Sequence, residues 1–476
     1  MHYALQVPGA LHAGTLEVTS PFDGEPVATV ETIDESGAER ALQVATKLYA
    51  DRSAWLPADE RAAILERTVV LMRNRFDALA RMAVLEGGKP LTDTRIELER
   101  AIDGVKNCAE CIRGEHGSEV QMQLNASSAN RVAFTRREPI GVVVAVSAFN
   151  HPLNLIVHQV GPAVASGCPV IIKPAQETPA ICFEFVGLLR EAGLPEGWCQ
   201  AVAVSDLSVA EKLVTDARVA FFSFIGSANI GWMLRSKLAP GTRCALEHGG
   251  AAPVIVAQDA DLDDALPLLA KGGFYHAGQV CVSVQRVFAH SAVFADVSER
   301  LAALAGILRV GDPLEEETDV GPLIRHRETE RVTAWVDEAV RGGADLLQGG
   351  ERLSPSLYAP TVLANPPEQA AVSRKEVFGP VICLYEYDEL DDAVRRSNAL
   401  PFAFHSAVMS RSIDTALYAY KHLAASAVMV NDHTAFRVDW MPFAGLRQSG
   451  YGVGGIPQTY KEMQFEKMLV LRSSAL

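Results

Sequence analysis

From residue 140 onward, short apolar runs rich in β-branched residues alternate with longer stretches of helical spacing. Such runs are typical of buried strands, and the helical stretches then return the chain to the start of each next strand. This order indicates parallel sheets covered by helices. The runs fall into two sets, over residues 142–146, 170–172, 201–204 and 220–225, and over 253–256, 282–288, 381–387 and 427–430. The sequence therefore predicts an α/β protein with two Rossmann-like lobes, after an irregular opening near Ser20 and helices over residues 35–115.

Two further stretches fit neither lobe. Residues 119–138 contain two extended runs around Asn125-Ala126-Ser127-Ser128, which predicts a hairpin, and residues 468–471 read Met-Leu-Val-Leu. Because an uncovered apolar edge strand promotes aggregation, we expect both stretches to pair with another subunit.

Charge and composition restrict the partners and the compartment. The chain has 476 residues and a net charge of −15, which argues against nucleic-acid or anionic-membrane partners. Its most apolar region, residues 140–175, is interrupted by polar side chains and is too broken to span a membrane. Residues 1–14 contain no Lys or Arg and no signal-peptide core, and eight cysteines are few for a disulfide framework in so long a chain. We therefore expect a cytoplasmic protein with free thiols.

Two segments place a reactive side chain beside glycine. Residues 278–281 read Gly-Gln-Val-Cys, so backbone N–H groups near Cys281 are expected to lower its pKa and to stabilise an oxyanion. Glu247 follows an apolar strand and precedes Gly249 and Gly250, a position suited to a general base with a raised pKa. The alternatives are a buried structural thiol and a solvated acid at a strand end.

Other candidates lie at predicted strand ends. Asn150 is either a neutral oxyanion donor or a cap for the next helix. Gly226 and Ser227 join a strand to a helix, where a pyrophosphate can approach, and Lys173 ends another strand. Cys108-Ala-Glu-Cys111 lacks a second pair of ligands, so we predict two helical thiols and no metal site.

In this order along the chain, seven motifs resemble those of the aldehyde dehydrogenase superfamily, and the match covers essentially the whole sequence. They are Phe149-Asn150-His151-Pro152-Leu153, Ile172-Lys173-Pro174-Ala175, Phe224-Ile225-Gly226-Ser227, Leu246-Glu247-His248-Gly249-Gly250, Gly278-Gln279-Val280-Cys281, Glu376-Val377-Phe378-Gly379-Pro380 and Met441-Pro442-Phe443-Ala444-Gly445.

The resemblance implies a division into three parts. A cofactor-binding domain would comprise residues 1–118 and 140–246, and a catalytic domain would comprise residues 247–455. A small β oligomerisation element would comprise residues 119–139 and 456–476. The assembly implied is a homodimer or a homotetramer.

The resemblance also implies an enzyme that oxidises an aldehyde to a carboxylic acid with NAD or NADP. Cys281 would be the nucleophile, Glu247 would activate the hydrolytic water, and the Asn150 amide with the Cys281 backbone N–H would hold the oxyanion. The residues implied in cofactor binding are Lys173, Ala175, Gln176, Gly226, Ser227, Glu376 and Phe378. Two alternatives stay open, a coenzyme A-acylating enzyme and a catalytically silent structural protein, although intact Cys281, Glu247 and Asn150 favour hydrolysis.

Two departures from the family pattern concern the cofactor and the base. NAD-preferring members usually carry a glutamate three residues after the lysine, where this chain has Gln176 followed by Glu177. A neutral Gln176 would not repel a 2′-phosphate, yet no neighbouring arginine demands one, so NAD is favoured with NADP open. The acidic residue often found downstream of Ser449-Gly450 is replaced by Val453-Gly454, which leaves Glu247 without a second candidate base.

The substrate is indicated by residues that line the family's substrate tunnel. Arg437 and His151 favour a short aldehyde with a polar or anionic tail, such as a semialdehyde, sulfoacetaldehyde or lactaldehyde. Val280 argues against a phosphorylated substrate, because relatives that bind phosphate can carry arginine there. The alternative for Arg437 is a structural ion pair with Asp439 or Asp432.

Overall fold

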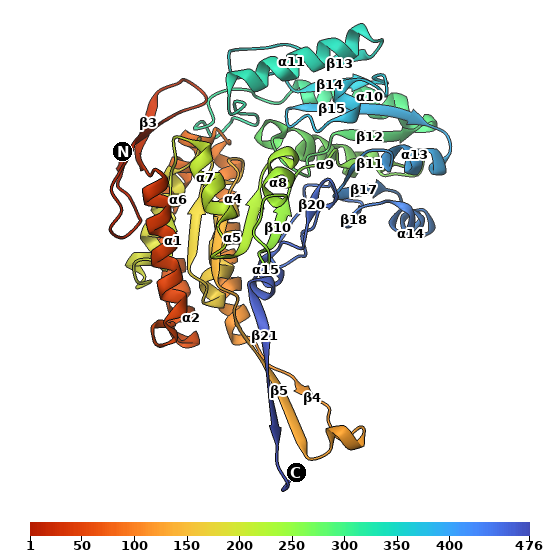
Figure 1. Cartoon of the computed structure of the whole chain (residues 1–476). Coiled ribbons are helices and arrows are strands. Elements are labelled where there is room, and N and C mark those ends of the chain that lie inside the picture. The colour runs from red at the N-terminus through yellow and green to blue at the C-terminus, as the bar shows by residue number, and fades with distance from the viewer.

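Two large sheets lie side by side in the computed structural model, which describes residues 1–476, and a narrow arm projects below them (Figure 1). The predicted α/β class is confirmed. The first sheet has the order β20-β10-β9-β6-β7-β8 and is parallel except for the β10–β20 pair. Its strands are β6 (Val142–Val146), β7 (Val170–Lys173), β8 (Cys199–Ala201), β9 (Val219–Ile225), β10 (Arg243–Glu247) and β20 (Gly450–Tyr451).

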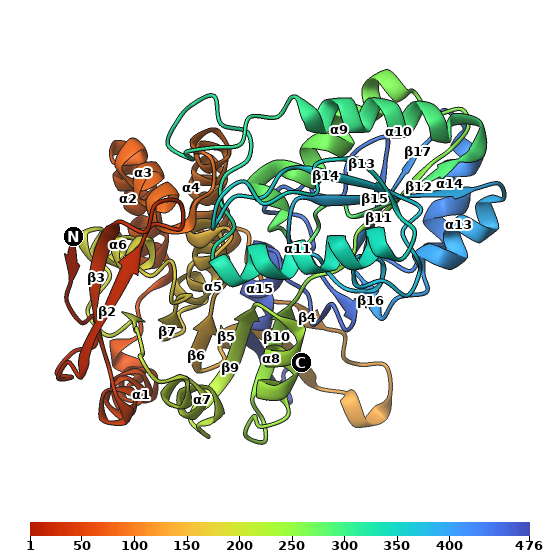
Figure 2. The same ribbon diagram turned by 90° about the horizontal axis from the view of Figure 1, so that it is seen from above.

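Helices cover both faces of this sheet because its strands are apolar on both sides. Side chains of β6 alternate between two cores: Val143 and Ala145 enter one, and Val142 and Val144 enter the other. Figure 2 shows α1 and α7 on one face and α2 to α6 on the other. The helices are α1 (Glu35–Ala50), α2 (Ala58–Asn74), α3 (Phe76–Gly87), α4 (Leu91–Arg113), α5 (Pro152–Ser166), α6 (Ala180–Glu191), α7 (Leu207–Thr215) and α8 (Ala228–Arg235). The predicted helical segment over residues 35–115 is confirmed.

The second sheet has the order β13-β14-β15-β12-β11-β17-β18 and is parallel except for the edge strand β13. Its strands are β11 (Pro253–Val256), β12 (Arg286–His290), β13 (Asp345–Gln348), β14 (Thr361–Ala364), β15 (Val381–Tyr387), β17 (His405–Met409) and β18 (Ala427–Val430). Its helices are α9 (Leu262–Phe274), α10 (Ser291–Gly306), α11 (His326–Arg341), α12 (Ala371–Arg374), α13 (Leu390–Ser397) and α14 (Ile413–His422).

The arm is a three-stranded antiparallel sheet of order β21-β5-β4, from β4 (Glu119–Val120), β5 (Arg131–Pro139) and β21 (Gln464–Arg472). The predicted hairpin is confirmed by the pairing of Glu119 with Phe134. The C-terminal strand pairs with that hairpin within the same chain, beginning after α15 (Ile456–Glu462), and leaves one edge of β21 unpaired.

Several short strands were not predicted. The opening residues form a sheet of order β1-β3-β2, from β1 (His2–Tyr3), β2 (Gly14–Thr19) and β3 (Pro26–Thr32), and β16 (Phe402–Ala403) pairs with β19 (Leu446–Arg447). None of the helices combines the length and apolar character needed to cross a membrane.

The topology fixes where the site lies. Because β6, β7, β9 and β10 are parallel, the candidates that follow them gather at the carboxyl edge of the first sheet. In the second lobe the candidates precede their strands instead, since Cys281 comes before β12 and Glu376 before β15. The carboxyl edge of one sheet therefore faces the amino edge of the other.

Candidate active site

A cleft of about 620 Å³ lies between the two lobes and is lined by residues from both. Most candidates from the sequence line this cleft, and their convergence from distant segments marks it as the default site for a ligand. The candidates that line it are Asn150, His151, Ala175, Gly226, Ser227, Glu247, Cys281, Glu376, Phe378 and Arg437. Lys173 and Gln176 do not line it.

Cys281 follows a strained turn that brings it to the cleft. His276 and Ala277 have left-handed backbone angles, with φ of 49° and 52°. Gly278 also has a positive φ, and a Cβ there would overlap the carbonyl oxygen of Gly379, so only glycine fits. Burial raises the pKa of Cys281 to about 12, against the opposing charge of Arg437. The expectation of a lowered pKa was therefore wrong, because desolvation outweighs the stabilisation of the thiolate.

Glu247 ends β10 and lies in the cleft. Burial raises the pKa of its carboxyl group, as predicted, and Arg437 opposes that rise. A Cβ at position 454 would overlap Oε1 of Glu247, so Gly454 provides the room that this carboxylate occupies. Gly454 thus stands where many family members are expected to have an acidic residue. Glu247 therefore remains the candidate base.

Asn150 is tied to the segment that carries the cysteine. Its Nδ2 donates to the backbone carbonyl of Gln279, at 2.9 Å. The alternative role as a helix cap is wrong, because the cap position of α5 is His151 and Asn150 makes no capping bond. The Asn150 amide therefore lies next to the backbone segment that leads to Cys281.

Glu376 and Phe378 come from the second lobe, in the loop before β15. Burial raises the pKa of Glu376 to about 8. Its Oε1 is buried without a hydrogen-bond partner, and Gly249 lacks the side chain that would overlap this carboxylate. An unpaired buried acceptor in the cleft fits a ligand that brings hydroxyl groups, as the riboses of a dinucleotide would. Phe378 has a φ of 46° and lies edge-on to Phe149, with 5.9 Å between ring centroids.

Lys173 and Gln176 lie behind the cleft wall. Lys173 Nζ donates to the Pro174 carbonyl at 3.0 Å, and Gln176 Nε2 donates to the Val204 carbonyl at 3.3 Å. Burial lowers the pKa of Lys173 to about 8, and the charge of Arg325 adds to this lowering. The structure thus turns both side chains toward the backbone rather than the cleft.

Arg325 is a residue that the sequence analysis missed. It lines the cleft and forms an ion pair with Glu177. The sequence shows no arginine next to Gln176. Arg325 is remote from Gln176 in sequence, just before α11, and no local motif marks it. The structure therefore places a cation in the cleft, close enough to Lys173 for its charge to lower the pKa of that lysine.

Arg437 lies over the Phe443 ring, with its guanidinium carbon 3.5 Å from the ring centroid. Its Nη2 lies 3.3 Å from His158 Nδ1, and its Nε is buried without a partner. The ion-pair alternative is wrong, because Asp439 pairs instead with Arg100 at 2.9 Å and with His158 at 2.7 Å. Asp432 bonds the backbone N–H of His433. Arg437 therefore lines the cleft without a carboxylate at ion-pair distance.

No group of three His, Cys, Asp or Glu side chains is arranged to hold a metal ion. All eight cysteines are free thiols, which agrees with the expectation from their number.

Comparison with known proteins gives full-length matches. Residues 10–469 match the profile of the Aldehyde dehydrogenase family. A 3-sulfolactaldehyde dehydrogenase from Priestia aryabhattai is 36% identical over 471 residues, covering 98% of each chain. The crystal structure of aldehyde dehydrogenase 21 from Physcomitrella patens, in complex with the reaction product succinate, is similar at a TM-score of 0.95 and 33% identity, covering 99% of this chain and 98% of that one.

Similar structures include users of both cofactors. A glyceraldehyde-3-phosphate dehydrogenase from Methanocaldococcus jannaschii, complexed with NADP, has a TM-score of 0.92 and 31% identity over 97% of this chain and 100% of that one. An NAD-dependent aldehyde dehydrogenase from Sinorhizobium meliloti has a TM-score of 0.94 and 30% identity over 99% and 95% of the two chains. The chain thus belongs to the aldehyde dehydrogenase family, and it is an oxidoreductase that oxidises an aldehyde with NAD or NADP.

Proposed function

We propose that this chain oxidises a short aldehyde with a polar or anionic tail to the free carboxylic acid, through a thioester on Cys281. The observation that carries the proposal is the guanidinium of Arg437, which forms no ion pair with a carboxylate and lies in the same cleft as Cys281, Glu247 and Asn150. Arg437 acts electrostatically on both Cys281 and Glu247, so it lies near the reacting groups.

The chemistry follows from the protonation states. With its raised pKa the resting Cys281 is a neutral thiol, so it needs a base. The charges of Glu376 and Glu247 both act on this thiol, and we assign the base to Glu247. Glu247 removes the thiol proton, sulfur bonds to the aldehyde carbon, and the new oxyanion accepts hydrogen bonds from the Asn150 amide and the Cys281 backbone N–H. When the oxyanion re-forms the carbonyl, the C–H bond of the former aldehyde carbon breaks and a thioester remains on Cys281. A nicotinamide held in the cleft would accept the hydride that leaves. Ser227 and Glu376, which line the cleft, would hold the cofactor's pyrophosphate and ribose.

Release of the acid requires water. Glu247, deprotonated again, removes a proton from a water molecule that attacks the thioester carbon, and the sulfur leaves as the acid forms. A carboxylate in this position supports hydrolysis over transfer to coenzyme A. The test is oxidation of succinic semialdehyde with NAD in the absence of coenzyme A, with succinate measured as product. A strict requirement for added coenzyme A would contradict the hydrolytic route.

The names of two similar proteins support a substrate with an anionic tail. 3-Sulfolactaldehyde carries a sulfonate and succinate a carboxylate, and Arg437 is suited to either anion.

Arg437→Met is expected to lower kcat/KM for succinic semialdehyde by about 10- to 100-fold, because a charged hydrogen bond to the carboxylate is lost while the apolar stem is kept. Butanal, in which a methyl group replaces the carboxylate, is the matched substrate, and its kcat/KM should fall much less. Equal losses for the two aldehydes would show that Arg437 does not recognise the tail.

We propose that both cofactors bind and that NAD is preferred. The reason is that the Glu177 carboxylate neutralises Arg325, which lines the cleft. Glu177→Gln is expected to tighten NADPH binding relative to NADH by about tenfold, since Arg325 is then free for the 2′-phosphate. Calorimetric or fluorescence titration of the two reduced cofactors measures this without turnover. Gln176→Glu is the control, and it should shift the ratio in the opposite direction; an unchanged ratio in both variants would remove this region from cofactor choice.

For the assembly, we propose a homodimer or homotetramer that forms through the arm. Met468, Leu469, Val470 and Leu471 on β21 are each about half exposed, and β21 is an edge strand. A partner strand or sheet would cover this apolar surface. We also keep the three-part division predicted from the sequence. Residues 1–118 and 140–246 would bind the cofactor, residues 247–455 would carry the nucleophile, and residues 119–139 with 456–476 would form the arm. Eight free thiols support a reducing, cytoplasmic compartment.

A further inference from the structure

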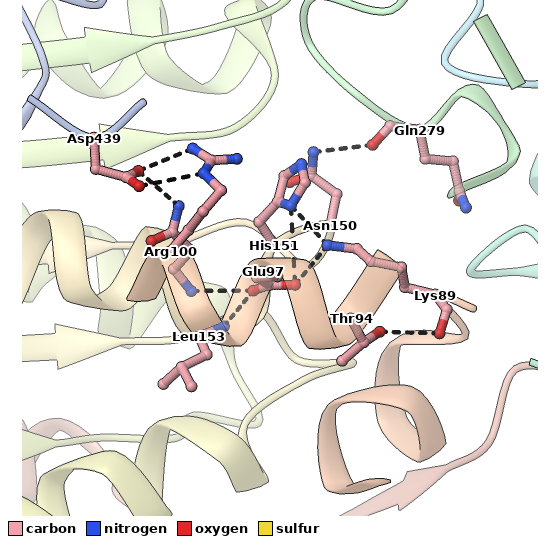
Figure 3. Close-up of polar contacts among 10 residues, drawn as sticks. Lys89, Thr94, Glu97, Arg100, Asn150, His151, Leu153, Gln279 and Asp439 are labelled. Carbon is pink, nitrogen blue, oxygen red and sulfur yellow. Dashed lines mark hydrogen bonds and ion pairs between the residues drawn. The ribbon is translucent and has the colours of Figure 1, made fainter. Parts of the chain in front are cut away.

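A buried ion pair lies beside the cleft, outside all the motifs considered above (Figure 3). Lys89 follows α3, and Glu97 lies on α4. Lys89 Nζ donates to Glu97 Oε2 at 2.5 Å, and each residue is only 2% exposed. Buried ion pairs are costly to desolvate and tend to be retained where further hydrogen bonds complete them.

Both partners reach the segment that carries Asn150. Glu97 Oε1 accepts the backbone N–H groups of Leu153 and Asn154 in the first turn of α5, each at 3.0 Å. Lys89 Nζ lies 2.6 Å from His151 Nδ1. The pair thus fixes the backbone on one side of His151 and one nitrogen of its ring.

The contact with Lys89 determines which ring nitrogen of His151 carries the proton. A lysine ammonium has only donors, so Nδ1 must accept and Nε2 must carry the hydrogen of the neutral ring. Burial lowers the pKa of Lys89, and the charge of Glu97 opposes this. Because the Glu97 carboxylate lies 2.5 Å from Nζ, we assign Nζ as the ammonium. Burial also lowers the pKa of His151 well below its usual range, as does the charge of Lys89. His151 is therefore neutral.

The other nitrogen, Nε2, is directed to the cleft. The side chain of His151 is 13% exposed and lines the cleft, and no protein group bonds Nε2. Nε2 is not fully buried, so it keeps contact with the cleft space. His151 directly follows Asn150, and its ring lies 6.3 Å from that of Tyr275. A donor here opens into the same cleft as Asn150 and Cys281.

We propose that Lys89 and Glu97 are positioning residues that hold His151 as a neutral Nε2–H donor, and that this donor selects aldehydes with an oxygen acceptor near the carbonyl, such as 2-hydroxyaldehydes. The inference rests on the proposed function and deepens it. Arg437 recognises charge at the tail, whereas a neutral imidazole adds no charge and favours a hydroxyl oxygen. The two groups together describe a substrate with a hydroxyl near the aldehyde and an anion farther away.

The test compares two aldehydes that differ only in that hydroxyl, lactaldehyde and propanal. The quantity measured is the ratio of their kcat/KM values, which cancels general damage to the enzyme. His151→Phe keeps an aromatic ring and removes the donor, and the ratio should fall about five- to tenfold. His151→Gln keeps a neutral N–H donor and should retain most of the ratio. An unchanged ratio in His151→Phe would overturn the proposal.

The positioning role is tested by the double variant Lys89→Met/Glu97→Gln, which removes the pair without leaving one buried charge alone. Either ring nitrogen of His151 is then free to carry the proton, so the ratio should fall toward that of His151→Phe. Wild-type selectivity in this folded variant would overturn the role of the pair. If the double variant does not fold, His151→Phe still decides whether the donor exists.

Tyr275→Phe is the control, because it removes a neighbouring hydroxyl from the same cleft wall. It should leave the ratio unchanged, and a ratio that falls here but not in His151→Phe would assign the donor to Tyr275 and overturn the proposal. Failure of the wild-type enzyme to oxidise any aldehyde of the panel would contradict the proposed function itself, whereas an unchanged ratio in an active His151→Phe enzyme contradicts only this inference.

Discussion

Cys281→Ala is expected to lower kcat for every aldehyde by at least about 10⁴-fold, because no covalent intermediate can form without the sulfur. The loss should be in chemistry and not in folding, since the side chain is only partly buried and the change removes a single atom. Steady-state formation of reduced cofactor, measured with wild-type and variant enzyme at equal concentration, gives the ratio.

The matched control is Cys244→Ala, which changes another partly buried thiol. Cys244 lies on β10 outside the cleft, so this variant should keep turnover close to that of the wild type. Substantial activity in Cys281→Ala, or an equal loss in both variants, would show that Cys281 is not the nucleophile.

Glu247→Gln is expected to separate the two halves of the reaction. Deacylation loses its base, so steady-state kcat should fall by about 10²- to 10⁴-fold. Acylation also slows, but it can still draw on the small fraction of thiolate in equilibrium with solvent, so it should slow less than deacylation. One equivalent of reduced cofactor per site should therefore appear before turnover stalls. Rapid mixing measures that burst.

A Glu247→Gln enzyme with unimpaired steady-state turnover would contradict the assignment of the base. The position of Gly454 sharpens this test, because no acidic side chain stands there to replace Glu247. Gly454→Ala is a useful companion, since its Cβ would displace the Glu247 carboxylate and should slow the same step.

The main strands were predictable where burial on both faces gave continuous apolar runs, as in β6 and β9. Several strands escaped prediction, among them the buried β14 and β17 and the more exposed β2 and β13. β2 reads Gly-Thr-Leu-Glu-Val-Thr, and its alternating pattern faces solvent on one side. β13 is an edge strand with mostly exposed residues, so it has no continuous apolar run either. Their pairing depends on strands elsewhere in the chain, which a local pattern does not encode.

The site was predictable to the extent that motifs carried it. Motif order indicated Cys281, Glu247 and Asn150, and the fold brings all three to one cleft. The missed groups, Lys89, Glu97 and Arg325, lie in other segments and reach the cleft only through tertiary packing. The pKa of Cys281 was mispredicted for the same reason, because its burial arises from residues that are distant in sequence.

The proposed reaction passes through a thioester on Cys281, which water activated by Glu247 hydrolyses. The most direct measurement is mass spectrometry of Glu247→Gln, quenched in acid after mixing with succinic semialdehyde and NAD. The account predicts a succinyl group on the peptide that contains Cys281, at close to one per chain, and its absence from Cys281→Ala. An unmodified Cys281 alongside a full burst of reduced cofactor, or an acyl group on another residue, would contradict it.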